Sequence, residues 1–71
     1  HLSDHFQDAD ISDLLFFGKD KTRVTQVGIS LGNGKVIHSS GWVKLNSMIE
    51  GDSGFNPELV QNFISVNRYM I

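Results

Sequence analysis

The segment TQVGISLGNGKVIHSSG, residues 25–41, carries the side chains of this chain that are best suited to chemistry. Two apolar runs flank a Gly-Asn-Gly-Lys turn, with Gln26 at the start of the first run and His38 at the end of the second. A histidine beside a nucleophile can take its proton. A glutamine amide has no titrating nitrogen, so it donates or accepts hydrogen bonds and cannot act as a base. The two residue types therefore indicate either an acid–base site that lacks one partner or two ordinary polar residues on strands.

The turn between the two runs decides whether these side chains can meet. Asn33-Gly34 is the strongest short hairpin signal, because both residues tolerate positive φ. With the turn centred there, Gln26 is expected roughly across from Gly41, and within reach of residue 38 or residue 40 if a bulge shifts the register. We therefore predict that side chains 26 and 38 face a common pocket wall.

The strand that carries Gln26 is expected over residues 23–31, where β-branched residues alternate with smaller ones. The more apolar face is predicted to be the core face, and the small, polar face to be the floor of a cleft. The predicted core face holds Thr25, Val27, Ile29 and Leu31, and the predicted cleft face holds Val24, Gln26, Gly28 and Ser30.

The remaining elements also read mainly as strands. The run LLFF is predicted to be a strand buried on both faces, and Ser3 or Asp4 to cap a short N-terminal helix. Gly41 is expected at a bulge or bend. The predicted ranges are strands 14–17, 35–40, 42–46 and 63–71 and a helix at about 57–62. These elements predict an α+β fold that is mostly antiparallel sheet with one short helix, in a single domain over residues 1–71.

Composition excludes several classes of site. The 71 residues include no cysteine, so the chain has no disulfide, no cysteine-based zinc site and no cysteine nucleophile. A net charge of -2 with mixed signs argues against nucleic-acid binding, which needs a clustered basic face. No apolar run approaches the length of a membrane span. A sheet in so short a chain leaves edges exposed, which favours self-association into a homo-oligomer.

Several linked motifs resemble the NlpC/P60 family of papain-like cysteine peptidases. The family pattern is a Gly-Asp-Leu-(Val/Leu)-Phe-Phe strand, then His-Val-Gly-Ile-Tyr, a Gly-Asn/Asp-Gly-Lys turn and Ile-His-Ala-Ser. The matching segments are residues 13–17, 27–29, 32–35 and 37–39. The tail, SGWVKLNSM and then NRYMI, is similar to the branch that cleaves γ-D-glutamyl-diamino acid bonds in cell-wall peptides.

The resemblance implies that this chain is the sheet-forming half of such a domain, without the N-terminal half that carries the catalytic cysteine. It places Gln26 where the family has its general-base histidine, and His38 where the family has the residue that orients that histidine. The implied substrate is a peptidoglycan stem peptide, and the implied location is the bacterial cell envelope, periplasmic or extracellular. No cofactor or metal is implied. With Gln26 in the base position, the usual mechanism is expected to fail even beside a partner cysteine.

Plainer interpretations stand beside these. Without the family resemblance, Gln26 is an ordinary polar residue on a solvated strand face, and His38 a half-buried histidine satisfied by the backbone. Asp13 is interpreted as a turn or cap residue rather than a catalyst. Trp42 with Lys44 either lines a ligand groove or packs on a neighbour.

Two further motifs are weaker. His1 and His5 are spaced as a metal pair would be on a helix, but a frayed terminus or tag remnant is the favoured explanation. Gly28 and Gly32 are not expected to form a phosphate loop, because no helix N-terminus follows them.

Three functions are consistent with the sequence. The first is part of a cell-wall peptide hydrolase, inactive as the chain stands. The second is a non-catalytic muropeptide-binding or protein-interaction module that keeps the cleft. The third is a small β-rich module that assembles by dimerisation.

Overall fold

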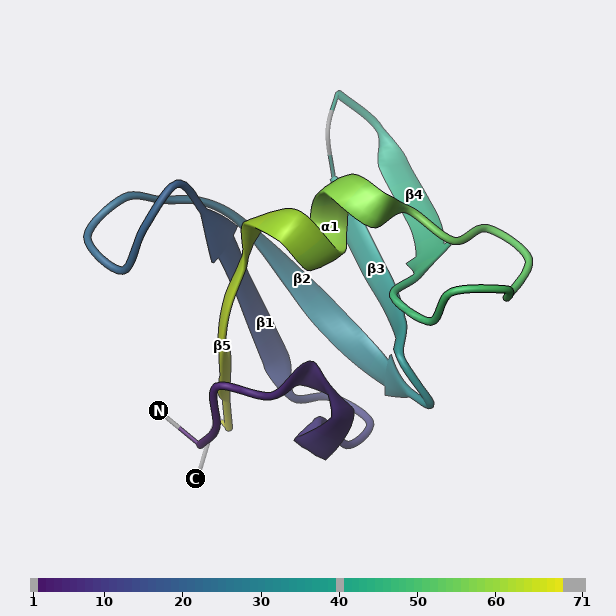
Figure 1. The fold of residues 1–71 in the computed structure, drawn as a ribbon, viewed down its shortest axis with the longest axis horizontal. Helices are drawn as coiled ribbons and strands as arrows, with labels where there is room; N and C mark the ends of the chain where they lie inside the picture. The colour runs from purple at the N-terminus through teal and green to yellow at the C-terminus, as the bar shows by residue number, and fades with distance from the viewer. Residues whose placement is uncertain (1, 40, 69–71) are drawn as a thin grey trace.

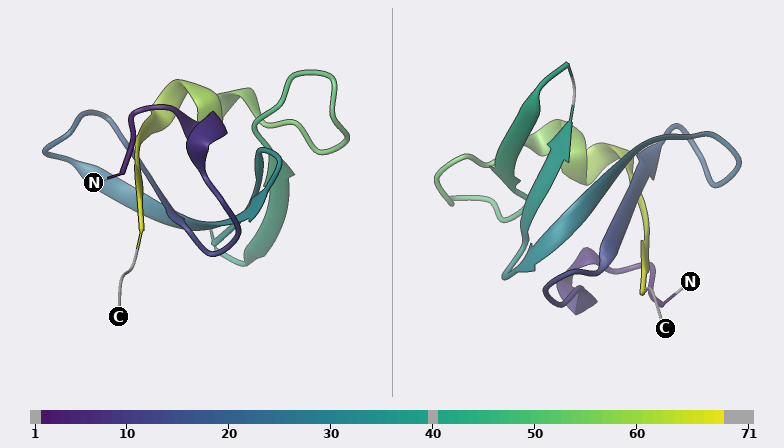
Figure 2. Two further views of the ribbon diagram at one scale, coloured as in Figure 1. Left: turned by 90° about the horizontal axis from the view of Figure 1, so that it is seen from below. Right: turned by 180° about the vertical axis from the view of Figure 1, so that it is seen from behind.

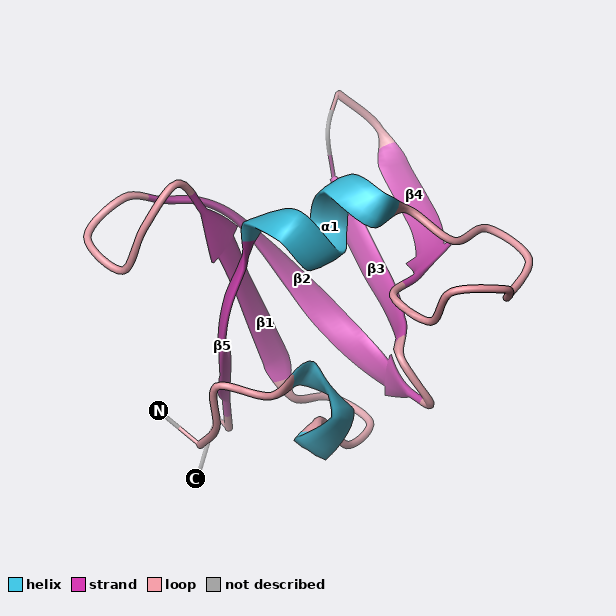
Figure 3. Ribbon diagram, viewed as in Figure 1, coloured by secondary structure: helices cyan, strands magenta, loops and turns pink. Residues whose placement is uncertain are grey.

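A computed structural model describes residues 2–39 and 41–68. These residues form a small, mostly β domain with one antiparallel sheet in the order β4-β3-β2-β1-β5, as Figures 1 and 3 show. The elements are η1 (Phe6–Asp8, a 3-10 helix), β1 (Leu14–Gly18), β2 (Val24–Gly32), β3 (Lys35–Ser39), β4 (Val43–Ser47), α1 (Pro57–Asn62) and β5 (Phe63–Asn67). The predicted antiparallel sheet and short α-helix are confirmed for the described residues. Residue 40 of the predicted strand 35–40 and residues 69–71 of the predicted strand 63–71 lie outside them, and β5 ends at Asn67 rather than continuing through Arg68.

The short helix α1 begins where local chemistry favours a helix start. Asn56 is its N-cap residue, and the Asn56 side chain accepts a hydrogen bond of 3.1 Å from the backbone N–H of Glu58. Pro57 occupies the first turn, where a missing N–H costs nothing. In Figure 2, α1 and the N-terminal segment lie on the same side of the curved sheet. Leu59 is buried there.

The core fills the space between the sheet and α1. Phe63 meets Phe6 and Phe17 in edge-to-face contacts, with ring centroids 5.8 and 6.2 Å apart. The buried hydrophobic residues of the core are Leu15, Phe17, Val36, Met48, Leu59 and Val66. These residues lie on one side of the sheet, whereas Val27, Ile29 and Leu45 on the other side are 47%, 47% and 60% exposed.

Strand β2 buries the face opposite to the predicted one. Gly28 and Ser30 are buried, whereas Val27 and Ile29 are each 47% exposed. The prediction that Thr25, Val27, Ile29 and Leu31 form the core face is therefore wrong. The reason is the space available on the covered side: a Cβ added at Gly28 would lie 2.5 Å from Val36 Cγ2, so only small residues fit there.

Strand β1 lies inside the sheet, between β2 and β5, but its burial alternates. Leu15 and Phe17 are each only 1% exposed, whereas Leu14 and Phe16 are half-buried. The prediction of a strand buried on both faces is thus wrong for the outer face, because no helix covers that face in the described part of the chain.

The β2–β3 hairpin turns where the sequence predicts. Asn33 and Gly34 have φ values of 55° and 76°, as a type I′ turn requires. A β-bulge between Ser30 and Gly32 then shifts the register, so that Gly28 pairs with His38. Without the extra residue, His38 would lie opposite Ile29 and its side chain would point to the other face of the sheet.

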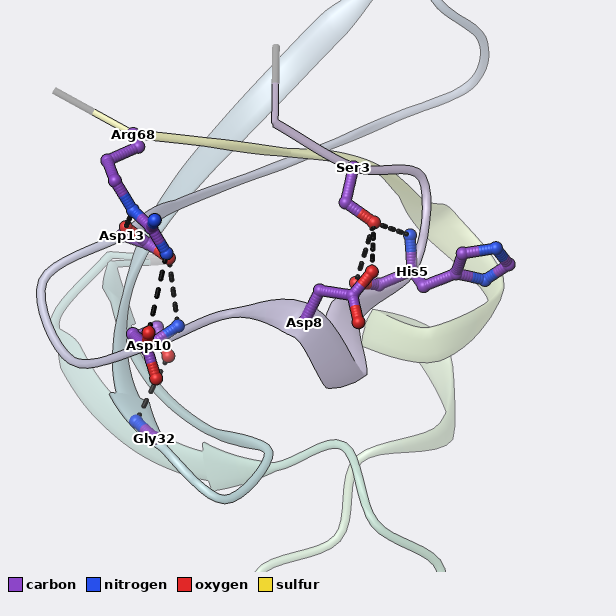
Figure 4. Close-up of polar contacts among 8 residues, drawn as sticks. Ser3, His5, Asp8, Asp10, Asp13, Gly32 and Arg68 are labelled. Carbon is purple, nitrogen blue, oxygen red and sulfur yellow. Dashed lines mark hydrogen bonds and ion pairs between the residues drawn. The ribbon is translucent and has the colours of Figure 1, made fainter.

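The N-terminal segment differs from the predicted capped helix. η1 is a short 3-10 helix whose N-cap residue is His5, and His5 makes no side-chain cap bond. The N-cap position is thus occupied by neither Ser3 nor Asp4. Instead, Ser3 Oγ donates to Asp8 Oδ2 at 2.5 Å and accepts from the His5 N–H at 2.9 Å (Figure 4).

Asp13 ties this segment to the end of β5. Its buried carboxylate accepts the backbone N–H of Asp10 at 2.8 Å, which confirms the predicted turn role. Figure 4 also shows the Arg68 guanidinium, whose Nε and Nη2 each donate to Asp13 at 2.8 Å. These bonds from Arg68 lower the pKa of the Asp13 carboxyl below its ordinary value. No sequence motif indicated this ion pair, since the two residues lie far apart in the chain.

Candidate functional site

A small polar pocket of about 130 Å³ lies where β2, β3 and β4 face α1. It is smaller than the roughly 300–1,000 Å³ of pockets that enclose a drug-sized ligand. It can therefore hold one functional group of a larger molecule rather than the whole of it. Its lining residues are Phe17, Thr25, Gln26, His38, Lys44, Asn56, Glu58, Leu59 and Asn62.

The structure brings Gln26 and His38 together on the wall of this pocket. Gln26 Nε2 lies 2.6 Å from His38 Nδ1 and also donates to the backbone carbonyl of Ser39 at 3.2 Å. The two side chains come from neighbouring strands and lie diagonally across the ladder, because Gly28 rather than Gln26 pairs with His38. His38 is only 5% exposed. Its imidazole is therefore held inside the protein by side chains, not by the backbone as the plainer interpretation expected.

Asn46 completes the surroundings of the imidazole, and sequence reasoning did not single it out as a site residue. Asn46 Oδ1 lies 2.7 Å from His38 Nε2, and Asn46 Nδ2 donates to the carbonyl of Gly54 at 3.0 Å. Asn46 belongs to β4 and shares its inner face with Lys44. The sequence signal that could have found Asn46 is the alternation of residues 42–46, which places Lys44 and Asn46 on the same side of that strand.

Two opposite charges border the pocket. Lys44 pairs with His38 across the β3–β4 ladder, and Glu58 comes from the first turn of α1. Together with the amides of Asn56 and Asn62, they make a lining rich in hydrogen-bonding groups. Such a lining suits a charged or amide-bearing ligand better than an apolar one.

Trp42 and Lys44 were expected either to pack on a neighbour or to line a ligand groove, and the structure matches each interpretation only in part. Lys44 Nζ lies 5.7 Å from the centre of the Trp42 ring, a cation–π contact. Lys44 also lines the pocket, but Trp42 does not, and it is 72% exposed. Gly41, just before Trp42, has a φ of 89° in a bend, as expected.

The remaining candidates do not join this site. His5 is exposed and precedes η1, and His1 lies outside the described residues. Among the residues that the structure describes, no group of three or more His, Cys, Asp or Glu side chains is placed to hold a metal ion. Gly28 lies within β2 and Gly32 ends it at the hairpin turn to β3, a setting that differs from a phosphate loop.

Comparison with known proteins gives no assignment: no protein-family model matches the chain, and no curated protein matches it. Within residues 2–39 and 41–68, no helix has the length and apolar character needed to cross a membrane.

The side chains that line the pocket determine which reactions it can support. Both ring nitrogens of His38 have a side-chain amide as partner, and the chain contains no thiol. The pocket wall can therefore bind and orient polar groups. It supplies no cysteine nucleophile of its own, and Gln26 cannot take a proton from a nucleophile that another polypeptide brings.

Proposed function

We propose that this chain is the sheet-forming part of a papain-like domain of the NlpC/P60 kind, related to enzymes that cleave γ-D-glutamyl-diamino acid bonds of peptidoglycan stem peptides. The observation that supports this proposal best is the contact of 2.6 Å between Gln26 Nε2 and His38 Nδ1 on a pocket wall. The family resemblance assigns these two positions to the general base and to its orienting residue.

In this proposal the chain by itself has no peptidase activity. The thiol nucleophile comes from a separate N-terminal half or another chain, because the sequence contains no cysteine. A thiol with its ordinary pKa near 8.5 is mostly protonated at neutral pH and needs a base. Gln26 occupies that base position and has no lone pair on its amide nitrogen to offer. Such a domain would work in the bacterial cell envelope, in the periplasm or outside the cell.

The decisive experiment restores the base. The chain is joined to the cysteine-bearing N-terminal half of an active NlpC/P60 domain, and hydrolysis of a γ-D-Glu-diaminopimelate peptide is followed by chromatography. The parent fusion should show no turnover, and the Gln26→His fusion should cleave the peptide at least about a hundredfold faster. Gln26→Leu is the matched control and should stay inactive. A folded Gln26→His fusion without hydrolysis would contradict the proposal.

A second candidate is a non-catalytic module that binds muropeptides or another protein. The observation in its favour is that the amides of Gln26 and Asn46 already satisfy both nitrogens of His38, so the network is complete without a nucleophile. In this case the parent fusion should bind the γ-D-Glu-diaminopimelate peptide in calorimetry and never cleave it. Absence of measurable heat would count against this candidate. The exposed outer face of the sheet makes self-association part of the same proposal.

A further inference from the structure

We propose that Asn46 is a positioning residue that makes His38 a hydrogen-bond acceptor for the side chain at position 26. The inference deepens the proposed function and rests on it for the role of position 26. Its observation is a chain of hydrogen bonds that runs in one direction across three strands, from Gln26 through His38 and Asn46 to the carbonyl of Gly54.

Backbone carbonyls at both ends of this series of hydrogen bonds fix the direction in which its groups donate. A carbonyl oxygen only accepts hydrogen bonds. Asn46 must therefore turn its NH₂ group toward the carbonyl of Gly54, 3.0 Å away, which leaves its oxygen facing His38 Nε2. Gln26 likewise turns its NH₂ group toward the carbonyl of Ser39, 3.2 Å away, and presents the same group to His38 Nδ1.

These two amides determine where the imidazole proton lies. Asn46 Oδ1 needs a donor, so His38 Nε2 carries the hydrogen. Gln26 Nε2 is itself a donor, so His38 Nδ1 keeps its lone pair. The opposite tautomer would set two donors against each other at Nδ1 and two acceptors at Nε2. Burial of His38 makes such mismatches costly.

A lone pair at Nδ1 is what an orienting residue must offer. If a histidine stood at position 26, its ring N–H would donate to His38 Nδ1, and its second ring nitrogen would keep the lone pair that accepts a thiol proton. Asn46 therefore acts one step behind His38: by holding the proton on Nε2, it keeps Nδ1 free to accept. Asn46 touches neither substrate nor thiol in this scheme.

The test reads the tautomer directly in the complete chain. Long-range ¹H–¹⁵N correlation spectra of the ¹⁵N-labelled protein distinguish protonated from unprotonated ring nitrogens, and His38→Gln identifies the His38 signals. The parent chain should show the hydrogen on Nε2. Gln26→Leu removes the donor at Nδ1 but leaves Asn46 in place, so the hydrogen should stay on Nε2. Asn46→Leu should give averaged signals from both tautomers.

The outcomes separate this inference from the proposed function. A hydrogen on Nδ1 in the parent chain, or an unchanged Nε2 tautomer in folded Asn46→Leu, overturns the role of Asn46. If Asn46→Leu fails to fold, the spectra of the parent and of Gln26→Leu still test whether Asn46 holds the proton on Nε2. Loss of the Nε2 tautomer in Gln26→Leu would show that Gln26, not Asn46, determines the tautomer of His38. In the fusion with Gln26→His, adding Asn46→Leu should lower kcat by about tenfold or more with little change in KM. A Gln26→His fusion that is inactive, together with a parent chain that has the hydrogen on Nε2, would contradict the proposed function but not the role of Asn46.

Discussion

Gly28 of β2 pairs directly with His38 of β3, one residue away from the pairing that an unbulged hairpin would give. This register places the His38 side chain on the covered face of the sheet, beside Gln26. Gly28, His38 and Lys44 form one row across β2, β3 and β4 on that face. The row directly beside it, Ile29, Ile37 and Leu45, faces the other side. A single bulge thus decides which row belongs to the pocket.

The close approach at Gly28 predicts a stability effect. Gly28→Ala should lower the free energy of unfolding by about 1–3 kcal/mol, because the new Cβ would meet Val36 Cγ2 at 2.5 Å and the carbonyl of Ile37 at 3.2 Å. Urea denaturation monitored by fluorescence measures this loss.

The control for this variant separates a steric cost from a backbone cost. A Cβ added at Gly41 would meet no other atom of the described residues within 4 Å, but Gly41 has a φ of 89°, so Gly41→Ala tests backbone strain alone. Val36→Ala, which truncates a buried core residue, should cost less stability in the Gly28→Ala background than in the parent chain, but as much in the Gly41→Ala background as in the parent. Equal behaviour of the two double variants would refute the steric explanation.

The Asp13–Arg68 ion pair predicts a dependence of stability on pH. The hydrogen bonds from Arg68 lower the pKa of Asp13 below its ordinary value of 3.8. A carboxyl with a lowered pKa in the folded state stabilises the fold in full above its unfolded pKa, and this stabilisation is lost as the pH falls through the lowered value. Arg68→Gln should therefore lower Tm by several degrees at neutral pH.

Below pH 3.8 the difference in Tm between the parent chain and Arg68→Gln should shrink, because Asp13 becomes protonated in both proteins. Lys21→Gln, which removes one positive charge from an exposed turn residue, is the matched control and should change Tm little at any pH. A constant difference between Arg68→Gln and the parent across the whole range would show that the ion pair does not carry the effect.

The outer face of the sheet predicts self-association. Ile29 and Leu45 are 47% and 60% exposed and lie in one apolar row across the ladder with Ile37 between them. Burying such a row against a second copy removes apolar surface from water. The weight-average mass in sedimentation equilibrium should therefore rise with protein concentration.

A lysine on this face should abolish the association. Ile29→Lys and Leu45→Lys are expected to sediment as monomers, whereas Val60→Lys, on α1, should associate like the parent chain. A parent chain that stays monomeric at every concentration and unfolds cooperatively would rule out the self-associating module.

Local signals explain what could be predicted from the sequence. Asn33-Gly34 placed the hairpin turn because both residues accept positive φ, and the structure has 55° and 76° there. Asn56 and Pro57 start α1 through a side-chain cap and a fixed φ, two effects that act within a single turn of chain. The antiparallel character followed from short, alternating runs joined by turns.

The face of β2 could not be predicted in the same way. Alternation shows that two faces differ, and the more apolar one is usually buried, but here the neighbours Val36 and Phe17 fill the space above Gly28. The contact between Asn46 and His38 was also hidden, because the two residues lie on different strands, eight residues apart in the chain.

The sequence by itself determined the turns, the strands, the single short helix and the absence of a thiol, because each of these depends on the residues of one short segment. Only the tertiary structure decided the bulged register, the buried face of β2, the Asp13–Arg68 pair and the contacts of Gln26 and Asn46 with His38. Each of these depends on which distant side chains meet, as Arg68 and Asp13 do across 55 residues of chain. Local propensity has no information about such partners, since long-range packing selects among faces and registers that are locally equivalent.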